Sequence, residues 1–179
     1  MKLIARYLRE AGLIGQQSTG GGAAKMTASD AASLLIAVNG SSPAKDAAQS
    51  VAEFWHLPLR TTFHEQMTDD LKYLEGEVLA ETFGETLERV ISLFMDEPSG
   101  LLLSGEVDGP SYIRLRIEFE RPGPEASIGI WTSPDGGQGR TSGLSMYFMH
   151  DEAEAEVDRN ISIKITHRTI GSVITALQS

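Results

Sequence analysis

Residues 113–120 read IRLRIEFE, and this stretch decides the fold that the sequence predicts. Apolar residues at the odd positions alternate with arginine and glutamate at the even positions. A period of two residues places the two sets on opposite faces of a β-strand, so one face is expected to be buried and the other to meet water. Such alternation is typical of antiparallel sheets, because the strands of parallel sheets are buried on both faces.

The same pattern continues along the carboxy-terminal half of the chain. We expect further strands at 101–107, around Ile128 and Ile130, at 144–148 and at 161–165. The connections at 108–110, 122–124 and 133–143 are rich in turn residues and too short for the crossovers of a parallel sheet. The sequence therefore predicts an antiparallel meander of about five strands. A final helix at 169–177, with an apolar stripe that starts at Ile170, is expected to cover the sheet.

Before Pro98 the apolar period indicates helices. Residues 3–11 form a short amphipathic stripe, and the apolar run 31–38, capped by Thr27 or Ser29, predicts a buried helix. Another helix is expected from Ser42-Pro43 to about Trp55. From Phe63 onward apolar residues step by three or four as far as Phe94, as one helix or as two. Gly76 and Gly84 favour a break, and Thr82 with Glu85 has the spacing of a capping box.

These elements predict an α+β protein in three regions. Residues 1–60 form a helical, weakly basic region with a glycine-rich loop, 61–97 form an amphipathic helix or helices, and 98–179 form the antiparallel sheet with its final helix. The length of 179 residues and the 41% hydrophobic content suffice for one good core or two small ones. No apolar run is long enough to cross a bilayer, and Arg6, Arg9 and Glu10 interrupt any signal-like segment. We therefore expect a cytoplasmic protein without a membrane contact.

The net charge of −10 is unevenly distributed. Residues 1–60 carry +2 and the remainder −12. Because an acidic surface repels phosphate, we expect any contact with duplex DNA to come from the amino-terminal part, where the candidates are Lys2, Arg6, Arg9 and Lys25. The alternative is that this region is simply a near-neutral surface, since DNA-binding domains are usually far more basic.

Two acidic groups suggest contact with a basic host or phage protein. On one continuous helix, residues at 77, 81, 85 and 88 would form a like-charge ridge, and a second block precedes the last strand. Together they could imitate a phosphate backbone, or they could be ordinary solvated faces. The candidates are Glu77, Glu81, Glu85, Glu88, Asp151, Glu152, Glu154 and Glu156.

Catalytic and metal-binding patterns are missing from the sequence. No cysteine is present, no nucleophile elbow or dinucleotide fingerprint occurs, and Lys25 in GGGAAKM is followed by Met26 instead of the Ser or Thr of a phosphate loop. The four histidines lack metal-ligand spacing, and Trp55 and Trp131 are expected to pack in the core or at an edge. We expect no catalytic residues, no metal, no cofactor and no enzymatic activity.

The first 40 residues resemble uncharacterised proteins of alphaproteobacterial genomes and their prophages. The resemblance is carried by LREAGLI at 8–14, the glycine-rich loop and MTxxDAAxLLIA at 26–37. Ser18-Thr19-Gly20 stands where those proteins often carry Gly-Arg-Gly, which weakens a DNA contact at this loop. The resemblance implies a phage-like context and supplies no activity and no catalytic residues.

Three hypotheses follow from the sequence. In the first, the protein is a prophage-type, nucleic-acid-associated regulator whose acidic part forms homo-oligomers or binds a protein. In the second, it is a phage-encoded inhibitor or adaptor that acts by protein contact, including acidic mimicry of nucleic acid. In the third, it is a small enzyme whose site the sequence does not reveal.

Overall fold

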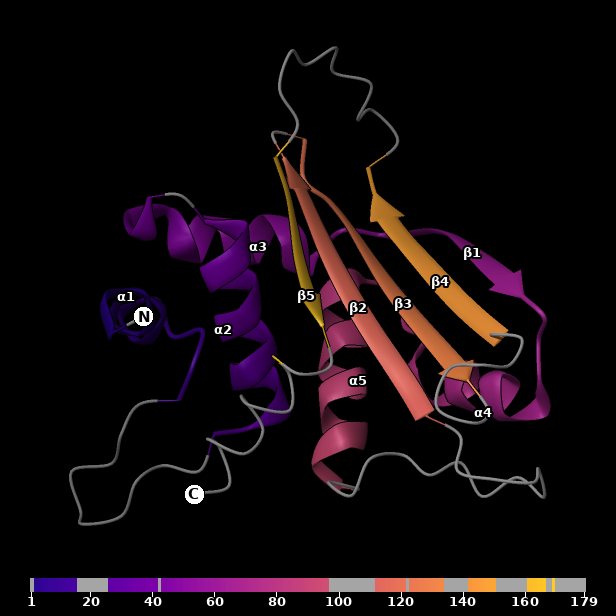
Figure 1. The fold of residues 1–179 in the computed structure, drawn as a ribbon. Coiled ribbons are helices and arrows are strands. Elements are labelled where there is room, and N and C mark those ends of the chain that lie inside the picture. Colours follow the sequence, from indigo (N-terminus) through magenta and orange to yellow (C-terminus); the bar gives the residue numbers. More distant parts are fainter. Residues whose placement is uncertain are drawn as a thin grey trace.

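The computed structural model describes residues 2–15, 26–41, 43–96, 112–121, 123–133, 142–150, 161–166 and 169. Five α-helices, one short 3-10 helix and five strands lie in these ranges, and the fold is α+β as predicted (Figure 1). The predicted strand at 101–107 and all but the first residue of the predicted final helix at 169–177 lie outside the described residues. In chain order the elements are α1 (Lys2–Glu10), α2 (Ala28–Gly40), η1 (Ala44–Asp46), α3 (Ala47–Trp55), β1 (Leu59–Glu65), α4 (Asp69–Val78), α5 (Phe83–Asp96), β2 (Tyr112–Arg121), β3 (Glu125–Ser133), β4 (Ser142–Met149) and β5 (Ile161–Thr166).

The five strands form one antiparallel sheet in the order β1-β4-β3-β2-β5. Only β2, β3 and β4 follow one another as a meander. β5 does not continue this meander beside β4, because β1 already occupies that edge. β5 pairs instead with the free edge of β2, so that Ile163 lies opposite Phe119.

The prediction of a helix starting at Phe63 was wrong. Residues 59–65 form the edge strand β1, and Phe63, which is 62% exposed, pairs with Ser145 of β4. The spacing between Phe63 and Met67 fits a helix, yet Thr61 and Thr62 are β-branched residues that suit a strand. The predicted helical region 61–97 therefore begins with residues that belong to the sheet.

Two helices, α4 and α5, account for the rest of the region 61–97. They are separated at 79–82, and the Thr82 hydroxyl accepts a hydrogen bond from the Glu85 backbone N–H at 3.4 Å. Gly76 and Gly84 do not break the chain, since both lie inside helices. Gly84 is required by packing: a Cβ there would lie 2.2 Å from the ring of Trp55.

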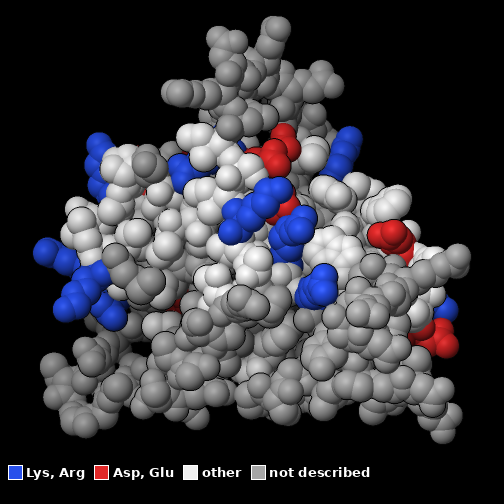
Figure 2. All heavy atoms as spheres, viewed as in Figure 1, with Lys and Arg blue, Asp and Glu red and all other residues white. Residues whose placement is uncertain are grey.

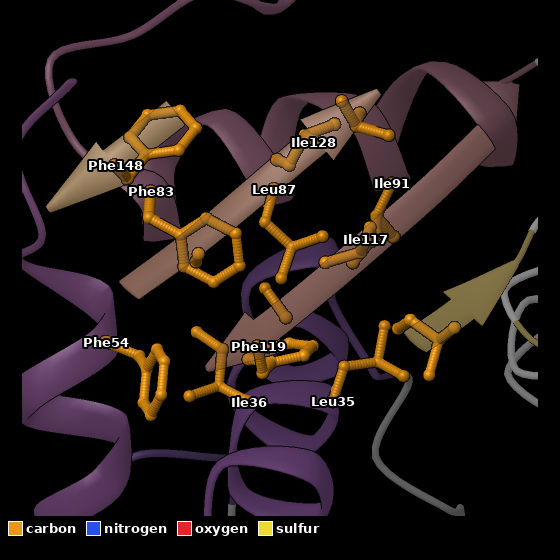
Figure 3. Packing of buried hydrophobic residues seen from close by; sticks show 14 of the residues in the cluster. Leu35, Ile36, Phe54, Phe83, Leu87, Ile91, Ile117, Phe119, Ile128 and Phe148 are labelled. Atoms are coloured by element: carbon orange, nitrogen blue, oxygen red, sulfur yellow. The ribbon is translucent and has the colours of Figure 1, made fainter. Parts of the chain in front are cut away.

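One hydrophobic core joins the helices to the sheet. Phe54 of α3, Phe83 of α5, Phe119 of β2 and Phe148 of β4 are almost fully buried (Figure 3). Phe119 contacts both Phe54 and Phe83 edge to face, and Phe83 contacts Phe148 in the same way, each with ring centroids 5.5 Å apart. Leu115, Ile117 and Phe119 of β2 are buried in this core, as their alternation predicts.

A capping box fixes the start of α2. The Thr27 hydroxyl accepts a hydrogen bond from the Asp30 N–H at 3.1 Å, and the Asp30 carboxylate accepts one from the Thr27 N–H at 2.9 Å. The same carboxylate accepts a third bond from the Gly15 N–H at 2.8 Å. Asp30 thus ties the segment after α1 to α2. Asp46, which precedes α3 in a similar Asp-Ala-Ala sequence, makes no side-chain capping bond.

We expect Asp30→Ala to lower the free energy of unfolding by about 1 kcal/mol, because two backbone N–H groups lose their acceptor. The matched control is Asp46→Ala, which should change stability by less than about 0.5 kcal/mol. Urea denaturation of the two variants measures the difference. Equal losses would contradict the role assigned to the Asp30 carboxylate.

Candidate functional site

The candidate site is the face of the sheet that points away from the described helices. We call it the open face (Figure 1). Residues paired across neighbouring strands share a face, so the register defines its members. From β1 to β5 in sheet order they include Thr61, Phe63, Glu65; Gly143, Ser145, Tyr147, Met149; Glu125, Ser127, Gly129, Trp131; Arg114, Arg116, Glu118, Glu120; Ser162, Lys164 and Thr166.

Trp131 lies flat against the open face because two glycines leave room for its ring. Gly143 is the direct partner of Trp131 in β4, and Gly129 precedes Trp131 by two residues on the same face of β3. A Cβ added to Gly129 would come within 2.0 Å of the indole ring, and one added to Gly143 within 2.6 Å. The guanidinium carbon of Arg116 lies 5.3 Å from the ring centroid, which is a cation–π distance.

Three aromatic residues together form what we call the aromatic platform: Phe63, Trp131 and Tyr147. Phe63 of β1 pairs with Ser145 of β4, and Tyr147 follows Ser145 by two residues on the same face. Ser145 in turn pairs with Gly129 of β3, and the Trp131 ring lies over Gly129 and Gly143. Phe63 and Tyr147 are 62% and 40% exposed. Aromatic side chains on a solvent-facing sheet are typical of contact surfaces, since large rings are otherwise buried.

Charged side chains border the platform on the β2 and β5 side. One carboxylate oxygen of Glu118 lies 3.2 Å from the Lys164 ammonium and 3.6 Å from the Arg116 guanidinium. Figure 2 shows basic side chains gathered over the middle of the sheet, with acidic ones beside them. Glu118 is 18% exposed and is shared by both cations, so its single charge offsets one of these two positive charges within the protein.

A pocket of about 360 Å³ lies on the same face. Small residues and the rings of Trp131 and Tyr147 both contribute to its lining. The lining residues are Arg116, Glu118, Glu120, Glu125, Ala126, Ser127, Gly129, Trp131, Ser145, Tyr147 and Met149. The volume is at the low end of small-ligand pockets, which span about 300–1,000 Å³.

The structure places three of the four predicted DNA-contact residues, and all three are exposed on α1. Arg6 donates a hydrogen bond to Glu10 at 2.7 Å, and this bond together with the carboxylate charge raises the pKa of Arg6. Lys2 and Arg9 have no ion-pair partner among the described residues. Lys25 lies outside the described ranges.

The predicted acidic ridge is not formed as one helical surface. Glu77 belongs to α4, Glu81 lies in the connection, and Glu85 and Glu88 belong to α5. The i, i+4 spacing therefore does not align the four carboxylates, because the chain turns at 79–82. Asp151, Glu152, Glu154 and Glu156 lie outside the described residues.

The histidines in the described ranges are not arranged around a metal. No group of three or more His, Asp or Glu in these ranges could hold a metal ion. His64 of β1 lies 3.0 Å from the Glu75 carboxylate of α4, which links strand to helix on the inner side. His56 and His150 are exposed, and His167 falls outside the described part.

Sequence reasoning missed the platform. Trp131 was expected in the core or at an edge, but β3 is a central strand and the ring is half-buried on the open face. The cause is register: alternation shows which face a residue occupies, but it does not show which residues lie across from it. The usable signal was the pair of glycines, since a glycine inside a strand often marks a close approach.

No family model, no curated protein and no solved structure matches this chain. Within the described ranges, no helix is both long and apolar enough to span a membrane.

We expect Gly129→Ala to displace the Trp131 ring from the sheet, because the new methyl group would overlap it. Tryptophan fluorescence should shift to the red and acrylamide quenching should increase. Gly123→Ala, in the β2–β3 turn, is the control, since a Cβ there meets nothing within 4 Å. Unchanged fluorescence in Gly129→Ala would contradict the flat placement of the ring.

Proposed function

We propose that the protein is a non-enzymatic binding protein that contacts a basic partner protein through its open face. The observation that carries this proposal is the aromatic platform, in which Phe63 and Tyr147 are exposed beside the flat ring of Trp131. Aromatic residues clustered near the centre of an exposed surface supply much of the energy of protein interfaces. This proposal keeps the adaptor or inhibitor hypothesis from the sequence, but it assigns the contact to the open face of the sheet instead of the acidic residues.

The charge of the chain favours a basic protein over a nucleic acid. The net charge is −10, so the protein as a whole repels phosphate and attracts basic surfaces. Of the cations beside the platform, Arg116 and Lys164 share Glu118. Arg114, directly opposite Trp131 on β2, is exposed. Stacked bases could use the aromatic rings, but a strand of nucleic acid also needs a positively charged groove.

Contact with duplex DNA through α1 is a second candidate. The exposure of Lys2, Arg6 and Arg9 on one helix favours it, while the hydrogen bond between Arg6 and Glu10 reduces the free charge. The regulatory role and the prophage context predicted from the first 40 residues belong to this candidate. The homo-oligomer predicted from the sequence competes with the main proposal wherever a second copy of the chain would cover the platform.

Peptide selection tests the main proposal without knowledge of the natural partner. A random peptide library is displayed and selected on the wild-type protein, and the enriched peptides are then titrated against variants. We expect Phe63→Ser and Trp131→Ala each to weaken binding at least about tenfold, as for central aromatic contacts. Tyr73→Ser is the matched control: Tyr73 is also 62% exposed, but it lies on α4.

Three results would overturn this proposal. One is a library that yields no binders. The second is a set of binders that are unaffected by both platform variants or equally weakened by Tyr73→Ser. The third is concentration-dependent dimerisation, measured by sedimentation, that is lost in Trp131→Ala, since it would identify a second copy as the occupant.

The DNA candidate predicts binding to a duplex that weakens with salt, with a slope of about −0.9 in log K against log salt for each phosphate contact. Arg6→Ala with Arg9→Ala should reduce the affinity and flatten the slope. Lys45→Ala with Lys72→Ala removes the same charge from other exposed positions and should change neither as much. Fluorescence anisotropy with a labelled duplex measures both, and equal effects of the two double variants would eliminate a specific role for α1.

A further inference from the structure

The pocket on the open face is lined by small, aromatic and charged side chains. Ser127, Gly129 and Ser145 line it with small side chains, while Trp131 and Tyr147 contribute aromatic surface. The Met149 thioether completes the apolar part. Aromatic faces attract cations through the ring quadrupole, and pockets of this type hold ammonium groups.

The charged residues of the pocket are mostly acidic. One arginine and three glutamates line it, which gives a formal net charge of −2. Glu118 is engaged by Arg116 and Lys164. Glu120 and Glu125 lie directly opposite each other on β2 and β3, a pairing of like charges that costs stability.

This like-charge pair has no cation to neutralise it in the described part of the chain. No basic side chain described by the structure lies within ion-pair distance of Glu120 or Glu125. Both carboxylates are only partly exposed, so a bound cation would be screened less by water than at a fully exposed site. A cation placed between them and the aromatic rings would relieve their repulsion.

We infer that this pocket binds the guanidinium or ammonium group of an arginine or lysine side chain from the partner protein. Glu120 and Glu125 supply the counter-charge, and Tyr147, which lies opposite Ser127 next to Glu125, contacts the flat or methylene part of the side chain, while Trp131 borders the other end of the pocket. An anionic ligand would meet a net negative lining. A neutral apolar ligand would cover the two carboxylates without pairing them, which is costly.

This inference rests on the proposed function and names the group that the partner inserts. The pocket therefore acts as the specificity element beside the aromatic platform: the rings supply contact area, and the carboxylate pair selects a basic side chain. Selectivity of this kind arises because a neutral side chain leaves charged groups unpaired.

Titration with small probes tests the pocket directly. N-acetylarginine amide, N-acetyllysine amide and the neutral N-acetylnorleucine amide are added to ¹⁵N-labelled protein, and the indole N–H resonance of Trp131, assigned with Trp131→Phe, is followed. We expect a saturable shift with the arginine or the lysine probe and a dissociation constant of about 1 mM, typical of so small a ligand. The norleucine probe should bind at least about fivefold more weakly, since it lacks the charge.

The carboxylate pair is tested with a charge-matched control. Glu120→Gln with Glu125→Gln should weaken the cationic probe at least about fivefold, and it should not weaken the norleucine probe, because covering two neutral amides costs less than covering two unpaired carboxylates. Glu77→Gln with Glu85→Gln removes the same two charges from exposed positions on α4 and α5, and should leave both probes unchanged. Thermal unfolding of each variant confirms that the fold is retained.

Several outcomes would overturn the inference. They are the absence of a shift with both cationic probes, equal binding of norleucine, and equal effects of the two double variants, which would indicate general charge attraction. In each case the proposed function is judged separately by the selected peptides. Peptides that need Phe63 and Trp131 but carry no basic residue would still support the aromatic platform as a contact surface, and they would refute the cation pocket.

Discussion

The contacts among Phe54, Phe83, Phe119 and Phe148 are the interaction on which the rest of the structure depends. They join α3 and α5 to β2 and β4, so the helical part and the sheet share one core. Because these rings commit one face of the sheet to the helices, the residues between them in sequence must face the other way. The open face, with its platform and pocket, exists because the other face of the sheet packs against the helices.

The parts of the fold that local sequence patterns determine were predicted, and the parts that depend on pairing between distant segments were not. The alternation in β2 and the Thr27 cap of α2 depend on neighbouring residues, and both are confirmed. Phe63 was misplaced because its distance to Met67 suits a helix as well as it suits a strand followed by a turn. The site was missed for the same reason: Gly143 makes room for Trp131 across a strand boundary, a relation that no local period contains.

The two candidate surfaces, α1 and the open face, differ in charge and in the kinds of side chain that they expose. α1 carries exposed cations, one of which is paired with Glu10, whereas the open face combines aromatic rings with an unneutralised carboxylate pair. Both surfaces suit binding, and the acidic balance of the chain favours a basic partner at the aromatic surface. The phage-like context and the homo-oligomer remain predictions from the sequence.

Hydroxyl-radical footprinting of the protein with and without a basic binding partner, such as a selected peptide, tests the central claim most directly. Aromatic rings and thioethers react with the radical in proportion to their exposure, so a contact appears as protection. The account predicts protection of Phe63, Trp131, Tyr147 and Met149, with Tyr73 of α4 unchanged. Protection of Tyr73 or of Tyr7 on α1, while the open face stays fully reactive, would contradict it.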